Sequence, residues 1–186
     1  MWLRGKFYCL SVGVNENYFE LFTLKQCFVI DLTALESHYR QIQSEAHPDR
    51  FVTASSSEKL KSMQLATLAN EAYQTLKKPA TRAKYLLTLN HIDATQETNT
   101  SMPADFLMQQ MEWREALEDY KVAKDVDGLE NLMKEMQQMA SALTNELNHL
   151  FDEKNDLTSA TATTRKLIFI DKVCEDIHKA ITQIED

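Results

Sequence analysis

The 186-residue chain is poor in the residues that form turns and cross-links. It contains three glycines and three prolines, which favours long helices joined by few connections. Cys9, Cys27 and Cys174 are far apart and in no metal-ligand spacing, so neither a disulfide framework nor a zinc site is expected. No apolar run approaches the roughly 20 residues that cross a membrane. We therefore expect an all-α protein of the reducing cytoplasm that does not contact a membrane.

The chain also lacks the motifs of several enzyme classes. It has no glycine-rich phosphate-binding loop and no magnesium-binding carboxylate cluster. Its five histidines show no paired ligand spacing, which argues against a metal site or another cofactor: His38, His47, His91, His149 and His178. An acid/base enzyme using His47 and Asp49 is the one catalytic alternative, and no nucleophile or metal constellation accompanies that pair. We expect a protein that is not an enzyme.

The net charge of −8 is unevenly distributed along the chain. Residues 17–90 carry nine Lys/Arg and seven Asp/Glu, whereas residues 91–186 carry nine and twenty. This asymmetry indicates two functional modules and argues against nucleic-acid binding by the acidic second one.

Residues 32–76 show the pattern of a helical hairpin. Apolar residues at steps of three and four predict one helix from Leu32 to Ala46 and a second from Glu58 to Leu76. Asp31 is a plausible cap of the first helix, and Pro48 ends it because proline has no backbone N–H. A short loop at the tip therefore carries His47, Pro48 and Asp49, the HPD tripeptide.

In this order and spacing, the motifs resemble a J domain: Asn17 to Phe22 (NYFELF), the HPD loop, and Asn70-x-Ala72-Tyr73-x-x-Leu76. Later segments are similar to the HscB-type co-chaperones of iron-sulfur cluster assembly: Arg82 to Leu87 (RAKYLL), Phe106 to Glu112 (FLMQQME) and Arg165 to Lys172 (RKLIFIDK). The resemblance extends from Asn17 to the C-terminus.

The resemblance implies that the HPD loop docks on a DnaK-like chaperone of the HscA type, where ATP is hydrolysed. Asp49 offers a charge-assisted acceptor for an arginine, and Pro48 reduces the entropy lost on docking. Arg40 and Arg50 add positive charge, but Glu36 and Glu45 share the helix and Ala46 replaces the tyrosine often found there. We expect weak steering and a transient complex. The alternative is a proline-terminated helix with Asp49 as a structural cap.

The second module is predicted to be an antiparallel three-helix bundle. Its first helix runs from about Ala104 to Lys124, and Gly128 is expected to punctuate it. The two following helices show narrow apolar seams. Their seams are Leu129, Leu132, Met136, Met139, Leu143, Leu147 and Leu150, and Thr163, Leu167, Ile170, Cys174, Ile177, Ile181 and Ile184.

The helix from Ala104 to Lys124 has apolar residues on two sides. Phe106, Trp113, Leu117 and Tyr120 form the core side. An opposite apolar strip shares its side with carboxylates, which favours an interface, although burial of this side against the J domain remains an alternative. The family resemblance implies that the strip binds an IscU-type scaffold through Leu107, Met108, Met111, Glu112, Glu115, Asp119 and Phe169. Ile168 lies off the seam without an assigned role.

The sequence thus predicts a co-chaperone that stimulates the ATPase of an HscA-type chaperone and delivers the IscU-type scaffold to it. The alternative is a general J-domain co-chaperone whose bundle binds unfolded clients. Residues 17–90 are the expected J domain, 91–103 a linker and 104–186 the bundle. Residues 1–16 precede the resemblance and are read as a disordered extension or as the product of a start codon assigned too far upstream.

Overall fold

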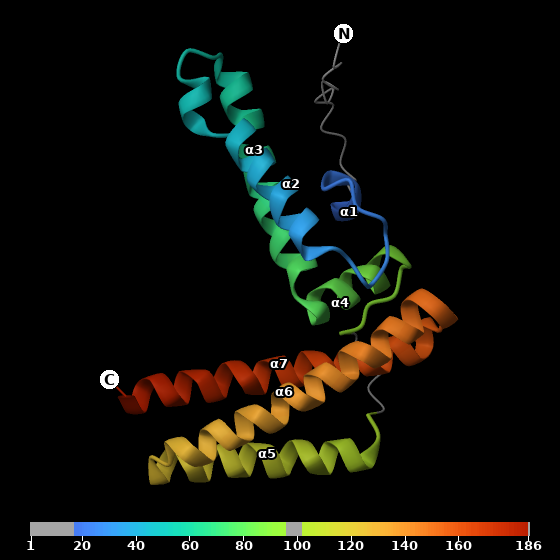
Figure 1. The fold of residues 1–186 in the computed structure, drawn as a ribbon, viewed down its shortest axis with the longest axis vertical. Coiled ribbons are helices and arrows are strands. Elements are labelled where there is room, and N and C mark those ends of the chain that lie inside the picture. The colour runs from blue at the N-terminus through green and yellow to red at the C-terminus, as the bar shows by residue number, and fades with distance from the viewer. Residues whose placement is uncertain (1–16, 96–101, 186) are drawn as a thin grey trace.

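The computed structural model describes residues 17–95 and 102–185, which form helices and no strand (Figure 1). The N-terminal part contains α1 (Tyr18–Leu21), α2 (Leu32–Glu45), the short 3-10 helix η1 (Pro48–Phe51), α3 (Ser56–Lys77) and α4 (Pro79–Leu89). The C-terminal part contains α5 (Ala104–Ala123), α6 (Val126–Asn148), the π-helical turn η3 (His149–Lys154) and α7 (Leu157–Glu185). The predicted extension 1–16 lies outside the described residues, as does 96–101 of the predicted linker, so the proposed domain limits stay predictions.

The helices α2 and α3 form the predicted hairpin and are capped by local side chains. Asp31 accepts hydrogen bonds from the backbone N–H groups of Thr33 and Ala34, which satisfies two unpaired donors at the start of α2. Ser55 and Glu58 form a reciprocal capping box at the start of α3. Each helix of the hairpin therefore begins where these side chains replace missing backbone hydrogen bonds.

The motif around Asn70 joins the two arms of the hairpin. The Tyr39 hydroxyl donates to Oδ1 of Asn70 at 2.6 Å, and Nε2 of Gln43 donates to the same oxygen at 2.9 Å. The rings of Tyr39 and Tyr73 stack with centroids 4.2 Å apart. Ala72 is fully buried on the neighbouring side of α3. These contacts explain the residue types in the sequence motif.

The short helix α1 packs across the hairpin, as its apolar residues predict. Phe19 and Phe22 are fully buried. The ring of Tyr18 stacks on Tyr85 of α4 at 4.4 Å, and the Tyr18 hydroxyl donates to Glu71 of α3 at 2.9 Å. Burial, followed by this carboxylate, raises the pKa of Tyr18 to about 12. The Tyr18 hydroxyl therefore stays protonated and holds α1 against α3 across the neutral range.

The helices α5, α6 and α7 form the predicted bundle (Figure 1). Gly128 does not separate its first two helices, because the chain reverses at Lys124, which has a left-handed φ of 53°, and α6 begins at Val126. Gly128 instead lies in the first turn of α6, where a Cβ would be 2.5 Å from Cδ1 of Tyr120. A Cβ at this position would force the Tyr120 ring to move, so the close approach of the ring, and not a turn, favours glycine here.

The two parts of the chain are packed together at one end of the bundle. The ring of Phe28 stacks on Phe151 with centroids 5.6 Å apart. The carboxylate of Asp152 accepts hydrogen bonds from the backbone N–H groups of Phe28 and Val29, both at 2.8 Å. The guanidinium of Arg82, from α4, lies 5.0 Å from the centre of the Phe28 ring. One loop of the N-terminal part is therefore held by η3 of the bundle.

Ile168, to which the sequence pattern assigned no role, belongs to the junction between the N-terminal part and the bundle. Arg165 donates to the carbonyl oxygen of Ala94 at 2.6 Å, and Glu175 lies 3.8 Å from the ammonium of Lys78. Residues 165, 168 and 175 lie on one side of a helix, because their spacings are three and seven. Ile168 is partly buried against the core from this side. Its off-seam position is explained by contact of α7 with the N-terminal part of the chain.

Candidate functional site

The HPD loop lies at the exposed tip of the hairpin. His47 caps η1, and its Nδ1 accepts from the Asp49 N–H at 3.3 Å. Pro48 occupies the first turn of η1, where its lack of an N–H costs no hydrogen bond. The Asp49 side chain is 87% exposed, with one carboxylate oxygen 3.6 Å from Nδ1 of His47. His47 performs the capping that one alternative assigned to Asp49, and the Asp49 carboxylate projects into solvent.

The two arginines predicted to assist docking already have intramolecular partners. Arg40 is exposed and paired with Glu36 one turn earlier on α2. Arg50 donates a long hydrogen bond of 3.5 Å to the carbonyl oxygen of Ser44. The exposed Arg40–Glu36 ion pair contributes little stability, and the carboxylate of Glu36 partly neutralises the Arg40 guanidinium. The expected weak electrostatic steering stays a prediction.

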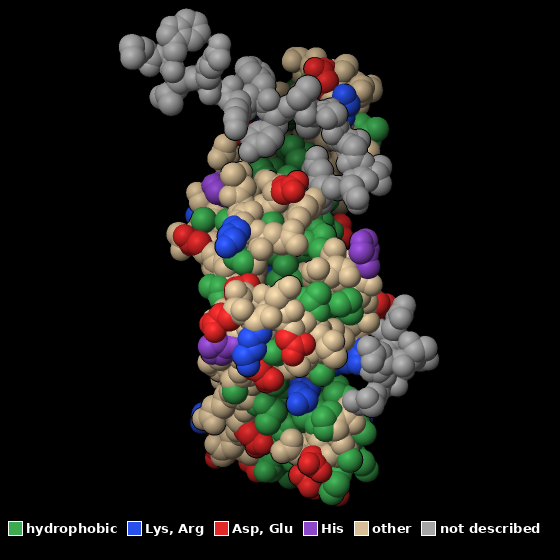
Figure 2. Space-filling view, turned by 90° about the vertical axis from the view of Figure 1, so that its right-hand side faces the viewer, with side chains coloured by type: hydrophobic (Ala, Val, Ile, Leu, Met, Phe, Trp, Pro, Cys, Tyr) green, Lys and Arg blue, Asp and Glu red, His purple; other side chains and the backbone are tan. Residues whose placement is uncertain are grey.

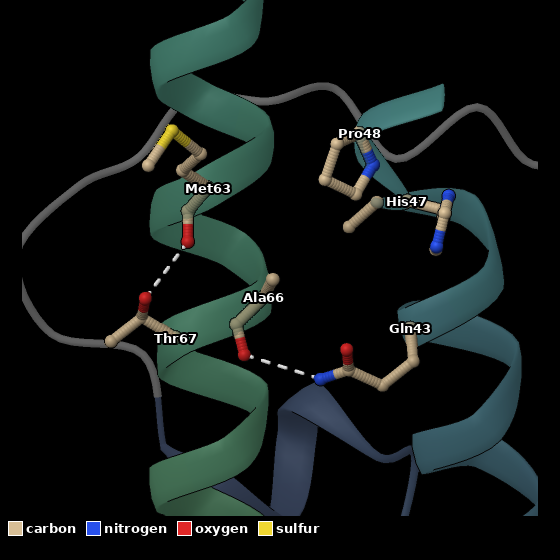
Figure 3. Close-up of a pocket in the computed structure, with 7 residues that line it drawn as sticks. Gln43, His47, Pro48, Met63, Ala66 and Thr67 are labelled. Carbon is tan, nitrogen blue, oxygen red and sulfur yellow. Dashed lines mark hydrogen bonds between the residues drawn. The ribbon is translucent and has the colours of Figure 1, made fainter. Parts of the chain in front are cut away.

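A hollow adjoins the HPD tip between α2 and α3 (Figure 3). Its volume is about 220 Å³. Figure 3 shows Met63, Ala66 and Thr67 of α3 on one side and Gln43, His47 and Pro48 on the other, and Ala46 also lines the space. No feature of the sequence predicts a hollow at the tip. It forms because residues with small side chains face the gap between the two arms.

The predicted strip on α5 is exposed. Leu107, Met108 and Met111 are 46%, 61% and 70% exposed. The carboxylates predicted to share the strip, Glu112, Glu115 and Asp119, are also exposed. On the face shown in Figure 2, hydrophobic side chains gather over the bundle part of the molecule with acidic side chains beside them. The alternative that the J domain buries this side of α5 is wrong.

Phe169 differs from the other residues predicted to bind the scaffold, because it is partly buried. Its ring contacts Phe106 edge-on at 5.9 Å and lies 6.2 Å from Trp113. The guanidinium of Arg114 covers the ring at 5.3 Å. Phe169 therefore packs between α5 and α7, against the side of α5 that carries Phe106 and Trp113. A partner can reach only the exposed part of the ring.

The sequence did not predict that Asp152, Phe28 and Arg82 join the two parts of the chain. Arg82 is 6% exposed and donates to the carbonyl oxygen of Leu76 at 2.6 Å. Burial is the main cause that lowers the pKa of its guanidinium, with Asp152 acting in the opposite direction. No local pattern marks these residues, because Phe28 and Asp152 are 124 positions apart. Only contact in three dimensions identifies them.

Residues 17–95 and 102–185 contain no group of three or more His, Cys, Asp or Glu side chains that could hold a metal ion. Within the same ranges, no helix combines the length and apolar character needed to cross a membrane.

Solved structures share this arrangement of hairpin and bundle. The chaperone HscB from Vibrio cholerae has a TM-score of 0.77 at 35% identity and covers 91% of this chain and 99% of its own. The human co-chaperone protein HscB has a TM-score of 0.81 at 26% identity, with 96% and 91% covered. The predicted fold class is confirmed, and an HPD-tipped hairpin joined to a helical bundle defines a J-domain co-chaperone.

Comparisons of sequence identify the family. A model described as the HSCB C-terminal oligomerisation domain matches residues 102–178. The co-chaperone protein HscB homolog of Burkholderia cenocepacia is 42% identical over 174 residues, which cover 94% of this chain and 99% of that protein. Its counterpart from Azoarcus sp. is 41% identical over 177 residues, covering 95% and 100%. The chain belongs to the HscB family of co-chaperones, as the resemblance predicted.

Proposed function

We propose that this protein stimulates the ATPase of an HscA-type chaperone and delivers an IscU-type scaffold to it during iron-sulfur cluster assembly. The observation that carries the proposal is the presence of two separate exposed sites on one connected body. The HPD tip lies at the free end of the hairpin, and the apolar and acidic strip lies on α5. The protein itself is not an enzyme, because ATP is hydrolysed on the chaperone.

The HPD tip is suited to docking on another protein. The Asp49 carboxylate is exposed, so an arginine on the chaperone can form a charge-assisted hydrogen bond with it. Pro48 and the His47 cap restrict the loop before the partner arrives, which lowers the entropy cost of binding. Arg40 and Arg50 can bind the chaperone only after they exchange their present intramolecular partners for groups on its surface.

The α5 strip is suited to holding a folded protein with a basic patch. Leu107, Met108 and Met111 supply exposed apolar area, and methionine adapts its shape to a partner. The neighbouring carboxylates favour a positively charged partner and suppress acidic ones. We assign the scaffold to this strip and to the exposed part of the Phe169 ring.

The junction between the two parts converts two binding sites into one tether. The stack of Phe28 on Phe151 and the hydrogen bonds to Asp152 limit the orientations of the hairpin relative to the bundle. A scaffold bound to α5 therefore experiences a raised effective concentration of the chaperone docked at the tip. We place this activity in the cytoplasm, where the free thiols Cys27 and Cys174 stay reduced.

An ATPase assay tests the proposal. The purified protein is combined with an HscA-type or a DnaK-type chaperone, each with and without the IscU-type scaffold. We expect stimulation of the HscA-type ATPase, with a further increase when the scaffold is present. Equal stimulation of both chaperones, together with binding of many unfolded apolar peptides by the bundle, would instead support the general co-chaperone.

A further inference from the structure

We propose that the hollow beside the HPD tip receives an aliphatic side chain of the DnaK-like chaperone when the tip docks. The inference rests on the proposed docking function and adds a second, apolar contact to it. Its basis is the size, the lining and the position of the hollow.

The hollow is large enough for a branched aliphatic group. Its volume of about 220 Å³ exceeds the roughly 150 Å³ of an engineered cavity that binds benzene. Ala46 and Ala66 contribute only methyl groups to its lining, so the space between α2 and α3 is left unfilled. A longer side chain at position 66 would occupy the same space.

The lining favours an apolar occupant over a polar one, because three of its polar groups already have partners within the hairpin. The Thr67 hydroxyl donates to the carbonyl oxygen of Met63, and Nε2 of Gln43 donates to the carbonyl oxygen of Ala66 (Figure 3). The Ala46 carbonyl oxygen accepts from the buried Ser62 hydroxyl. Apart from the His47 ring and the Gln43 side-chain carbonyl oxygen, the remaining lining consists of methyl, methylene and thioether groups.

Exposed apolar side chains extend the hollow along α3. Met63 is 63% exposed and forms part of the lining. Leu60, one turn earlier, is 56% exposed. Residues three apart lie on the same side of a helix, so the two side chains form a continuous apolar rim. Burial of this rim by a partner would be favourable.

The position of the hollow identifies the occupant. His47 and Pro48 belong both to its lining and to the HPD tip. A chaperone surface that contacts the exposed Asp49 carboxylate therefore also covers the mouth of the hollow. The hollow is continuous with the proposed docking surface, whereas the α5 strip lies on the bundle (Figure 1). This continuity favours the chaperone over the scaffold or a second copy of the chain.

Methyl NMR of the intact protein tests the contact. The methionine methyl groups are labelled with ¹³C, and the signals of Met63, Met108 and Met111 are assigned by replacing each with leucine. On addition of the HscA-type chaperone with ATP, we expect the Met63 signal to shift, and the Met108 and Met111 signals to stay. The shift should be absent in Asp49→Asn. A Met63 signal that does not move while the ATPase is stimulated, or that moves with protein concentration alone, overturns the proposal.

A filling variant provides the second test. Ala66→Met should raise the co-chaperone concentration that gives half-maximal ATPase stimulation about tenfold, because the occupant loses its space. Ala142→Met, at an exposed alanine of α6, is the matched control and should leave that concentration unchanged. Met63→Ala, at an exposed position that folding tolerates, should raise it several-fold.

These variants separate the two proposals. If Asp49→Asn abolishes stimulation but Ala66→Met and Met63→Ala leave it unchanged, the docking function is retained and the apolar contact is overturned. An absence of stimulation by the wild-type protein would overturn both.

Discussion

The carboxylate of Asp152 and the backbone N–H of Phe28 are joined by a hydrogen bond of 2.8 Å across 124 residues of sequence. This bond, with its neighbour to Val29, connects the loop before α2 to the turn between α6 and α7. Together with the stack of Phe28 on Phe151, it limits the orientation of the HPD tip relative to the α5 strip.

Removal of the Asp152 carboxylate should loosen this junction. We expect Asp152→Ala to lower the free energy of unfolding by about 1–2 kcal/mol, because two backbone donors lose a charged acceptor. Urea denaturation measures this change, and distances between spin labels on α3 and α5 should broaden. Glu153→Ala, which removes an exposed partner of His149, is the control. A junction that keeps its narrow distance distribution without Asp152 would show that the aromatic stack suffices.

Loss of the Asp49 charge should separate docking from scaffold binding. Asp49→Asn keeps the size of the side chain but removes the charge-assisted acceptor, so we expect ATPase stimulation to fall at least tenfold. Scaffold affinity, measured by calorimetry, should stay within about twofold of wild type, because the two sites are separate. Glu45→Gln on the same hairpin is the control. Full stimulation by Asp49→Asn would contradict the docking role.

The α5 strip and Phe169 should respond differently to truncation. Leu107→Ala combined with Met111→Ala should weaken scaffold binding by about 2–4 kcal/mol without changing stability, because both side chains are exposed anchors. Phe169→Ala should instead lower the free energy of unfolding by about 1–3 kcal/mol, because the ring packs against Phe106 and Trp113. Calorimetric binding and thermal denaturation measure the two effects. A double variant that unfolds would place Leu107 and Met111 in the core.

The contribution of Asp171 on α7 to the free energy of unfolding should become more favourable as the pH falls. Burial is the main cause that raises the pKa of its carboxyl, with Glu175 adding to the effect and Lys78 opposing it. The folded state therefore binds the proton more tightly than the unfolded state, and stability declines as the pH rises through the raised pKa. We expect Asp171→Asn to be more stable than wild type at pH 7. The difference should disappear below the ordinary pKa of 3.8, and denaturation over this pH range measures it. A difference that does not change with pH would contradict the assignment.

Gly128→Ala should destabilise the start of α6. Its Cβ would lie 2.5 Å from Cδ1 of Tyr120, so the ring has to move, at a cost of about 1–3 kcal/mol. Thermal denaturation detects the change, with Asp127→Ala in the same turn as the control. An alanine variant as stable as wild type would show that the Tyr120 ring relocates freely.

Much of the fold could be read from the sequence because helical periodicity is a local signal. The Asp31 cap, the end of α2 before Pro48 and the α6 seam all follow from residues within a few turns of one another. The same spacing predicted which side of α5 would be exposed, since Leu107 and Met111 point away from Trp113.

Other features could not be read in this way because they depend on residues from different helices. Gly128 was read as a break, but the Tyr120 ring determines its role. The periodicity of α7 placed Phe169 at the margin of the seam, and contact with Trp113 shows that the ring is partly buried. Ile168 is partly buried because α7 contacts the N-terminal part of the chain on this side.

The sequence by itself determined the helices, the HPD tip and the residues available to each face, because each depends on neighbours along the chain. The tertiary structure decided how the hairpin is held on the bundle, how the hollow forms between α2 and α3, and which aromatic rings are buried. Those features arise where distant segments come within contact distance, and helical spacing carries no information about that approach.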